Sequence, residues 1–147
     1  MSLKIVRNDL TKVFADVIVD TAKTDPIIGT GSDLVIYETA GKDALLAERL
    51  KIGKISFGDA AITPACKLFA KYIIHAVAPI WKCGNHDELK LLRQCYRKSL
   101  ELAVEKNCRS IAFPLLGTGN NRIPKDKALL AATAEIQKFL LTHDLEA

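Results

Sequence analysis

Residues 70–81 read AKYIIHAVAPIW, and the apolar run inside this stretch predicts a β-strand at 72–77. A second apolar run predicts another strand at 60–63. Only a short connection around residues 67–71 lies between them. We therefore expect the two strands to pair as an antiparallel hairpin.

The hydrophobic pattern on either side of this hairpin alternates between strands and helices. Residues 15–20 are mostly β-branched and apolar, as in a strand covered on both faces, and further strands are expected at 3–7 and 110–116. Helical spacing begins at Ser32, and Gly41 is expected to divide that region into two helices. Such alternation indicates an α/β fold with a mostly parallel sheet and helices on both faces.

Two longer helices complete the pattern. Residues 86–106 form the clearest helix, and Pro124 opens the last one at its favoured first-turn position. The positions expected to be buried are Leu89, Leu92, Tyr96, Leu100 and Ala103 in the first helix, and Leu129, Ala132, Ile136 and Phe139 or Leu140 in the second.

Length and composition indicate one globular domain spanning residues 1–147. The formal net charge is +4 and the Lys and Arg residues are dispersed, which favours an anionic small ligand over nucleic acid. The four cysteines show no CxxC spacing, so we expect reduced thiols in a cytoplasmic protein and no metal site. No segment has the signal-peptide pattern or the apolar length of a membrane span.

Two glycine-containing loops follow predicted strands: Gly29-Thr30-Gly31 after the 15–20 strand and Gly117-Thr118-Gly119 after the 110–116 strand. Ligands of open α/β sheets bind beyond the carboxyl ends of the strands. Glycine lets the backbone approach a ligand closely, and free N–H groups at a helix start suit phosphate. The pair of loops predicts a diphosphate site, although ordinary turns would also explain them.

Several longer motifs resemble the macrodomain family along nearly the whole chain. The matching segments are Asn8-Asp9-Leu10-Thr11, residues 15–19, Ala40-Gly41, residues 58–63, residues 70–81, residues 96–100 and residues 110–114. The resemblance implies a three-layer α/β/α sandwich around a mixed, mostly parallel sheet, with a cleft for ADP-ribose or a related nucleotide and no cofactor.

The same resemblance assigns the ligand site residue by residue. Asp9 would accept a hydrogen bond from the adenine amino group, assisted by the backbone of Leu10, although Asp9 is also a plausible helix N-cap. Residues 29–34 and 117–121 would hold the diphosphate. The residues expected at the ligand are Asp9, Leu10, Ala22, Lys23, Gly29, Thr30, Gly31, Ser32, Asp33, Leu34, Pro114, Gly117, Thr118, Gly119, Asn120 and Asn121.

The family's Asn-Ala-Ala-Asn motif is replaced here by Asp20-Thr21-Ala22-Lys23. Lys23 can donate but cannot accept, so it would reach a phosphate or carboxylate, pair with Asp33, or lie in solvent. Asp33 stands where hydrolytic members of the family carry their catalytic aspartate. Capping of a helix that begins near Leu34 is the alternative role for Asp33.

Two further departures lie in the second loop and at the C-terminus. Asn121 replaces an aromatic residue that covers the distal ribose, and Arg122 replaces a glycine, which together favour a more anionic ligand. The segment 142–147 leaves no room for the family's last strand. We therefore expect five strands instead of six, and an exposed edge that a homodimer would cover.

Three functions remain open from the sequence. The first is a binding module for ADP-ribose or a related nucleotide diphosphate. The second is a hydrolase that removes ADP-ribose from protein, or acetate from O-acetyl-ADP-ribose, through Asp33. The third is a degenerate domain that serves protein interaction.

Overall fold

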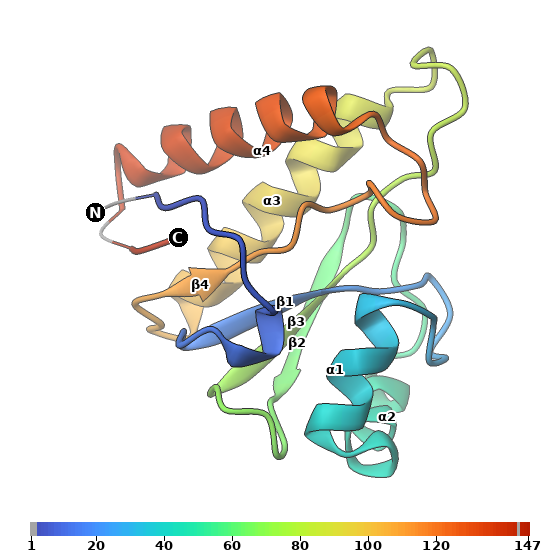
Figure 1. The fold of residues 1–147 in the computed structure, drawn as a ribbon, viewed down its shortest axis with the longest axis vertical. Coiled ribbons are helices and arrows are strands. Elements are labelled where there is room, and N and C mark those ends of the chain that lie inside the picture. The colour runs from blue at the N-terminus through green and yellow to red at the C-terminus, as the bar shows by residue number, and fades with distance from the viewer. Residues whose placement is uncertain (1–2, 144) are drawn as a thin grey trace.

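The computed structural model describes residues 3–143 and 145–147. Its central feature is a mixed sheet with helices on both faces (Figure 1). In chain order the elements are the 3₁₀ turn η1 (Leu10–Lys12), β1 (Val17–Thr21), α1 (Ser32–Ala40), α2 (Lys42–Ile52), β2 (Ala60–Pro64), β3 (Tyr72–Ala76), α3 (Glu88–Glu105), β4 (Ile111–Ala112) and α4 (Lys125–Leu140).

The strand order in the described residues is β2-β3-β1-β4. β1 pairs in parallel with both β3 and β4, whereas β2 and β3 are antiparallel, with Ile62 opposite Ile74. The expected hairpin and the mostly parallel sheet are therefore confirmed. Because the parallel strands share one direction, the loops that leave β1 and β4 emerge at the same edge.

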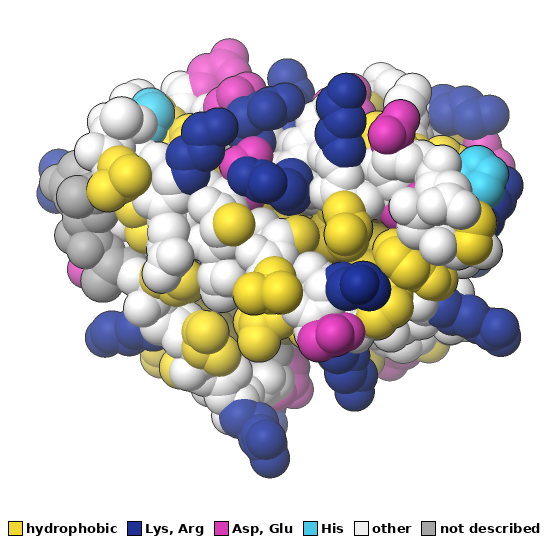
Figure 2. All heavy atoms as spheres, turned by 90° about the horizontal axis from the view of Figure 1, so that it is seen from above, with side chains coloured by type: hydrophobic (Ala, Val, Ile, Leu, Met, Phe, Trp, Pro, Cys, Tyr) yellow, Lys and Arg dark blue, Asp and Glu magenta, His cyan; other side chains and the backbone are white. Residues whose placement is uncertain are grey.

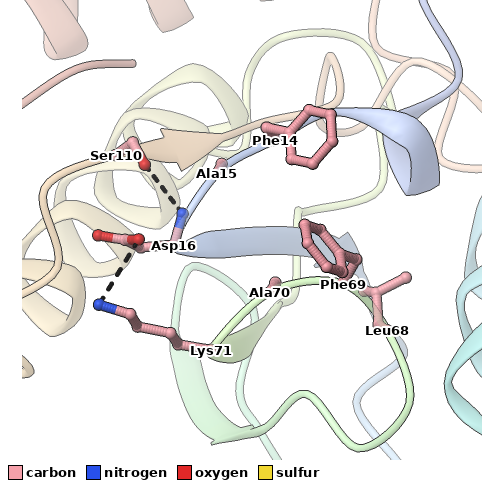
Figure 3. Close-up of a pocket in the computed structure, with 8 residues that line it drawn as sticks. All are labelled: Phe14, Ala15, Asp16, Leu68, Phe69, Ala70, Lys71 and Ser110. Atoms are coloured by element: carbon pink, nitrogen blue, oxygen red, sulfur yellow. Dashed lines mark hydrogen bonds and ion pairs between the residues drawn. The ribbon is translucent and has the colours of Figure 1, made fainter.

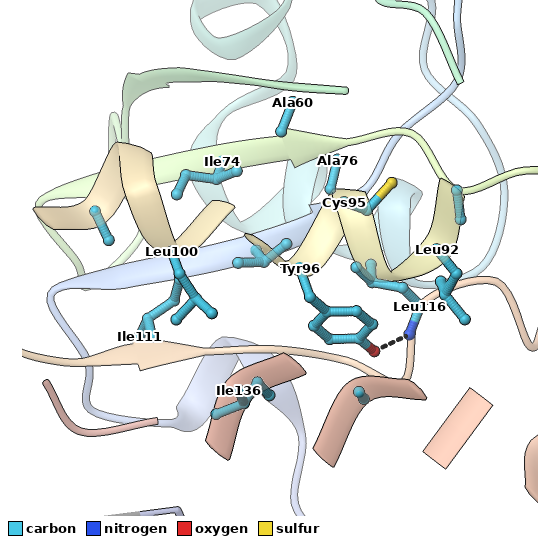
Figure 4. Packing of buried hydrophobic residues seen from close by; sticks show 14 of the residues in the cluster. Ala60, Ile74, Ala76, Leu92, Cys95, Tyr96, Leu100, Ile111, Leu116 and Ile136 are labelled. Carbon is cyan, nitrogen blue, oxygen red and sulfur yellow. Dashed lines mark hydrogen bonds between the residues drawn. The ribbon is translucent and has the colours of Figure 1, made fainter. Parts of the chain in front are cut away.

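Alternate side chains of β1 enter two separate cores. Val17 and Val19 pack with α3 and α4, while Ile18 packs with α1 and α2. This alternation follows from the two-residue period of a strand, and it places a helical layer on each face. Figure 4 shows the α3 side, where Tyr96 and Leu100 lie against the sheet. The three-layer α/β/α sandwich is confirmed.

Two predicted strands are wrong or shorter than expected. Residues 3–7 form no strand, and Ile5 and Val6 are 72% and 67% exposed. An alternating pattern becomes a strand only where a neighbouring strand supplies hydrogen bonds, and this segment joins no ladder of the described sheet, although Lys4 N donates to Ala147 O at 2.9 Å. β4 is confined to Ile111–Ala112, because Pro114 has no N–H with which to extend the ladder. The described residues therefore contain four strands, not the predicted five.

The segment after α4 returns to the edge of β4. Ser110 and Glu146 form a parallel bridge, in which Ile111 N donates to Glu146 O at 2.8 Å and Glu146 N donates to Arg109 O at 2.9 Å. Residues 145–147 thus cover part of the edge that we expected to be exposed. The bridge is a single contact and adds no further strand to the described sheet.

The helices agree with the predicted pattern except at a few positions. α3 begins at Glu88 and not at residue 86, because the Glu88 carboxylate accepts backbone hydrogen bonds from the preceding turn, among them Gly84 N at 2.9 Å and His86 N at 2.6 Å. In α4, Leu129 is 43% exposed, so its burial was wrongly predicted. Leu140 takes the buried position, one turn beyond Ile136.

The surface carries no single basic patch on the face seen from above. Figure 2 shows Lys and Arg side chains scattered over that face and interleaved with acidic and hydrophobic ones. None of the helices in the described residues combines the length and hydropathy needed to cross a membrane.

Candidate functional site

A cavity of about 690 Å³ opens at the carboxyl ends of β1, β3 and β4. It is lined by residues from the loops that follow each of these strands. The lining residues are Thr21, Ala22, Lys23, Thr24, Asp25, Ile27, Gly29, Thr30, Gly31, Ser32, Asp33, Phe57, Val77, Ala78, Ile80, Pro114, Leu115, Gly117, Thr118, Gly119, Asn120 and Asn121. We call this cavity the cleft.

Most of the residues predicted at the ligand lie together in the cleft; Asp9, Leu10 and Leu34 do not line it. Asp9 is the N-cap of η1, and its carboxylate accepts hydrogen bonds from the hydroxyl (2.8 Å) and the N–H (3.0 Å) of Thr11. These hydrogen bonds lower the pKa of Asp9. The capping role is therefore observed, and the adenine contact stays a prediction.

The first glycine loop ends at the start of α1, where Gly31 is the N-cap and no side chain caps the helix. Asp33 was proposed as that cap, which is wrong: it lies inside the helix and is 3% exposed. Its Oδ2 accepts a hydrogen bond from Gly29 N at 2.6 Å, and its Oδ1 has no hydrogen-bond partner in the described residues. A Cβ on Gly29 would lie 2.8 Å from Asp33 Oδ2, so a larger residue there would require the Asp33 side chain to shift.

The second glycine loop is held from behind by Tyr96. The Tyr96 hydroxyl accepts a hydrogen bond from Leu116 N at 3.0 Å, directly before the loop (Figure 4). Gly117 has a φ of +83°, and a Cβ there would clash with the side chain of Ile123. Tyr96 was assigned to packing alone, and its hydroxyl therefore has a second role that sequence reasoning missed.

Both loops that line the cleft contain backbone donors without a protein partner in the part of the chain that the structure describes. Within the described residues, the N–H groups of Thr118, Gly119 and Asn120 donate to no protein acceptor. The same holds for Thr30 and Gly31, and the first turn of α1 adds N–H groups that no helix can satisfy internally. Free N–H groups and the positive end of a helix dipole together attract an anion.

The two loops also contact one another. Asn120 Nδ2 donates a hydrogen bond to Thr30 Oγ1 at 2.9 Å. Asn121 Nδ2 donates to Ala78 O at 2.8 Å, so this donor is already used within the protein. Arg122 does not line the cleft. The expected cationic group of Arg122 is therefore not on the cleft wall, whereas Asn121 lines the cleft with its amide donor already bonded to Ala78 O.

Lys23 lines the cleft and is exposed, and in the described residues it forms no ion pair with Asp33 within 4.0 Å. Its aliphatic stem lies beside Gly29, where Lys23 Cε would be 3.2 Å from an added Cβ. The Arg49 guanidinium fixes the backbone here by donating to Lys23 O at 2.9 Å and Thr24 O at 3.2 Å, and it also donates to Gly53 O. Lys23 thus lines the cleft with an exposed side chain while its backbone is fixed by Arg49.

Sequence reasoning missed an apolar part of the cleft. Ile27, Phe57 and Ile80 line it and are 53%, 44% and 48% exposed. Exposed large apolar side chains are a common feature of ligand sites, but nothing local in the sequence separates them from buried ones.

A second hollow of about 470 Å³ lies at the opposite, amino ends of the parallel strands (Figure 3). Phe14 and Phe69 meet there edge to face, with ring centroids 5.2 Å apart, and Lys71 pairs with Asp16 at 3.7 Å. It is the smaller hollow and lacks the glycine loops. The cleft is therefore the better candidate for the functional site.

Metal-binding chemistry has little support in the described residues, where no three His, Cys, Asp or Glu side chains are grouped to hold an ion. Cys83 Sγ lies 3.7 Å from His86 Nδ1, but no further ligand joins the two. All four cysteines are free thiols.

Comparison with known proteins agrees with this geometry. The Macro domain family matches residues 19–132. The chain is 44% identical over 138 residues to the Macro domain-containing protein mll7730 of Mesorhizobium japonicum, covering 94% of this chain and 78% of that protein. It is 38% identical to the O-acetyl-ADP-ribose deacetylase of Salmonella gallinarum, covering 97% and 82% of the two chains.

A solved structure shares the fold. The Trypanosoma brucei macrodomain in complex with ADP-ribose superposes with a TM-score of 0.90 at 32% identity, covering 98% of this chain and 61% of that one. The residues that the family model matches include the end of β1, both glycine loops and Asp33. The chain therefore belongs to the macro domain family.

Proposed function

We propose that the protein binds ADP-ribose, or a related nucleoside diphosphate, in the cleft. The observation that carries the proposal is the pair of glycine loops, which line one cavity and contain N–H groups without a protein acceptor in the described residues. One loop would hold each phosphate, and the uncapped start of α1 adds its dipole. The solved T. brucei relative in complex with ADP-ribose supports the same ligand.

Calorimetric titration tests this function. We expect ADP-ribose and ADP to bind and ribose 5-phosphate to bind much more weakly, because it has one phosphate for two loops. Gly119→Ala provides the site variant, since an added Cβ meets no protein atom within 4 Å and would protrude into the cleft. Absence of heat with ADP-ribose and ADP at millimolar concentration would reject the proposal and favour the protein-interaction alternative.

A second candidate function is hydrolysis of an ADP-ribosyl or O-acetyl-ADP-ribose substrate. Asp33 favours it, because this buried carboxyl lines the cleft and one of its oxygens is fixed by Gly29 N at 2.6 Å. The relative named O-acetyl-ADP-ribose deacetylase supports it as well. Release of acetate or of ADP-ribose by the protein, compared with Asp33→Ala, tests it, and equal rates for the two proteins would reject it.

Three predictions concern the surroundings of the protein. We keep a cytoplasmic location, little affinity for nucleic acid, and a homodimer that covers an exposed sheet edge as predictions from the sequence. Light scattering after size exclusion tests the dimer. A monomer mass at all concentrations would contradict it.

A further inference from the structure

A cluster of buried polar side chains lies directly behind the cleft. It comprises Asp20 of β1, His75 of β3, Asp33 of α1 and Arg49 of α2, in which Asp20 lies beside His75 and Asp33, and Arg49 is near both carboxyls. The side chains of Asp20 and His75 are fully buried, and Asp33 and Arg49 are 3% and 1% exposed. Among the described residues, Arg49 is the one Lys or Arg that is buried. Sequence analysis assigned no function to Asp20.

Several atoms of this cluster lack a hydrogen-bond partner in the described residues: both carboxyl oxygens of Asp20, Oδ1 of Asp33 and Nδ1 of His75. Each unpartnered buried polar atom costs about 1–3 kcal/mol. Four such atoms in one cluster would reduce the folding stability considerably. The cost falls if two of them share a hydrogen atom and so form a hydrogen bond. Asp33 Oδ2 already has a partner, because it accepts a hydrogen bond from Gly29 N at 2.6 Å.

His75 is neutral and offers Asp20 only a lone pair. The Thr63 hydroxyl donates to Pro64 O at 3.1 Å, so it accepts the Nε2–H of His75 at 2.9 Å and leaves Nδ1 without a proton. Burial lowers the pKa of His75 to about 3. The 4.0 Å contact between His75 Nδ1 and Asp20 Oδ2 is therefore not an ion pair.

Charge balance then limits the cluster to one carboxylate. Arg49 always carries a positive charge, and His75 carries none. Two ionised carboxyls would leave an excess negative charge away from water, which is costly. Burial, and then the neighbouring Asp33 carboxyl, raise the pKa of Asp20 well above its ordinary value. The nearby Tyr37 hydroxyl also stays neutral, because burial raises its pKa.

We propose that Asp20 and Asp33 share one buried proton, and that protonated Asp20 is a positioning residue for the Asp33 carboxylate. The Asp20 O–H donates to Asp33 Oδ1, which gives a partner to one unpartnered oxygen on each side chain. Asp33 is then held from two directions, by Asp20 on one oxygen and by Gly29 N on the other. A protonated Asp has nearly the shape of Asn and the same lack of charge, so Asp20→Asn is its neutral replacement.

Infrared spectroscopy at mildly alkaline pH tests the shared proton without any ligand, so it is independent of the proposed function. We expect one C=O band of a protonated carboxyl, shifted in D₂O, in the wild type. Asp20→Asn and Asp33→Asn should each abolish it, because one carboxylate alone balances Arg49. Glu135→Gln is the matched control, since Glu135 is buried but lies 3.7 Å from the Arg93 guanidinium.

Two results would overturn the shared proton: no protonated-carboxyl band in the wild type, or a band that survives in Asp33→Asn. Circular dichroism ensures that each variant is folded. The band must also persist in Glu135→Gln, because its loss there would assign it to Glu135.

The positioning role rests on the proposed function and has its own test by titration with ADP-ribose. Asp20→Asn keeps a donor toward Asp33, so we expect its affinity to stay within about twofold of the wild type, whereas folded Asp20→Leu should bind about tenfold more weakly. Equal affinity of Asp20→Leu and the wild type would overturn the role. If the wild type itself does not bind, the proposed function fails and the infrared result still stands.

Discussion

Asn120 and Thr30 are far apart in the chain, yet the Asn120 amide donates a hydrogen bond to the Thr30 hydroxyl at 2.9 Å. Asn120 belongs to the loop after β4 and Thr30 to the loop after β1. This hydrogen bond connects the two glycine loops across the cleft. A ligand that occupies both loops must enter beside it or break it.

We expect Asn120→Ala to speed association of ADP-ribose with little loss of stability. Both side chains are exposed, so the hydrogen bond contributes less than about 1 kcal/mol to unfolding. Thr30→Val removes the same hydrogen bond from the other loop and should have the same effect. Stopped-flow kinetics check this, and the double variant should be no faster than either single one. Additive changes would show that the two residues do not act as a pair.

We expect Gly117→Ala to lower the folding stability and Gly119→Ala to lower the affinity for ADP-ribose. At Gly117 the added Cβ would clash with Ile123, and the φ of +83° adds strain, so we expect a loss of about 1–3 kcal/mol in unfolding free energy. At Gly119 no protein atom lies within 4 Å of the added Cβ, so stability should be unchanged and affinity for ADP-ribose should fall. Urea unfolding and calorimetry measure the two effects. Equal stabilities of the two variants would contradict the assignment of Gly117 to folding stability and of Gly119 to ligand binding.

Gly29→Ala should disturb Asp33 directly. The added Cβ would lie 2.8 Å from Asp33 Oδ2, the oxygen that Gly29 N now holds at 2.6 Å. We expect a destabilisation of about 1–3 kcal/mol and, if the protein is a hydrolase, a larger fall in kcat than in ligand affinity. Urea unfolding and turnover of O-acetyl-ADP-ribose measure these effects. A variant as stable as the wild type would show that Asp33 moves aside freely.

Arg49→Met should be strongly destabilising. The buried guanidinium satisfies the carbonyls of Lys23, Thr24 and Gly53 and balances a buried carboxylate, so its loss should cost about 3–5 kcal/mol. Arg97→Met is the matched control, because the Arg97 side chain is 51% exposed and its pair with Glu101 at 3.8 Å should contribute no more than about 1 kcal/mol. Urea unfolding of both variants checks the contrast, and similar losses would refute it.

Stability should depend on pH through Asp20 and His75 in opposite directions. Unfolded Asp20 ionises above 3.8 while folded Asp20 keeps its proton, so rising pH favours unfolding by about 1.4 kcal/mol per pH unit. Unfolded His75 gains a proton below 6.5 while the folded pKa is about 3, so its contribution to stability increases from pH 3 to 6.5.

The two slopes oppose one another between pH 3.8 and 6.5, and above 6.5 only that of Asp20 remains. Asp20→Asn removes that slope. We therefore expect the stability of Asp20→Asn, relative to the wild type, to increase steadily with pH above 3.8. Urea unfolding over a pH series measures the difference. Parallel curves for the two proteins would mean that folded Asp20 ionises normally.

Much of the fold and the outline of the cleft followed from local patterns in the sequence. The 72–77 strand, the hairpin with β2 and the division at Gly41 depend on neighbouring residues, so apolar periodicity and glycine positions were sufficient to predict them. The predicted strand at 3–7 was wrong because strand formation also depends on a partner that is distant in the sequence. Its residues alternate as in a strand, but in the described residues the segment pairs with no strand of the sheet, and Lys4 N donates instead to Ala147 O.

The amino-acid sequence by itself determined the family, the layer order and the placement of two glycine loops at one sheet edge, because these follow from short-range periodicity and from motifs. Only the tertiary structure decided that Asp20, His75 and Arg49 lie in one buried cluster with Asp33, and that Asn120 bonds to Thr30. Burial and pairing of side chains that come from distant elements depend on how the layers pack. Charge states and hydrogen-bond partners follow from that packing and from no single segment of the chain.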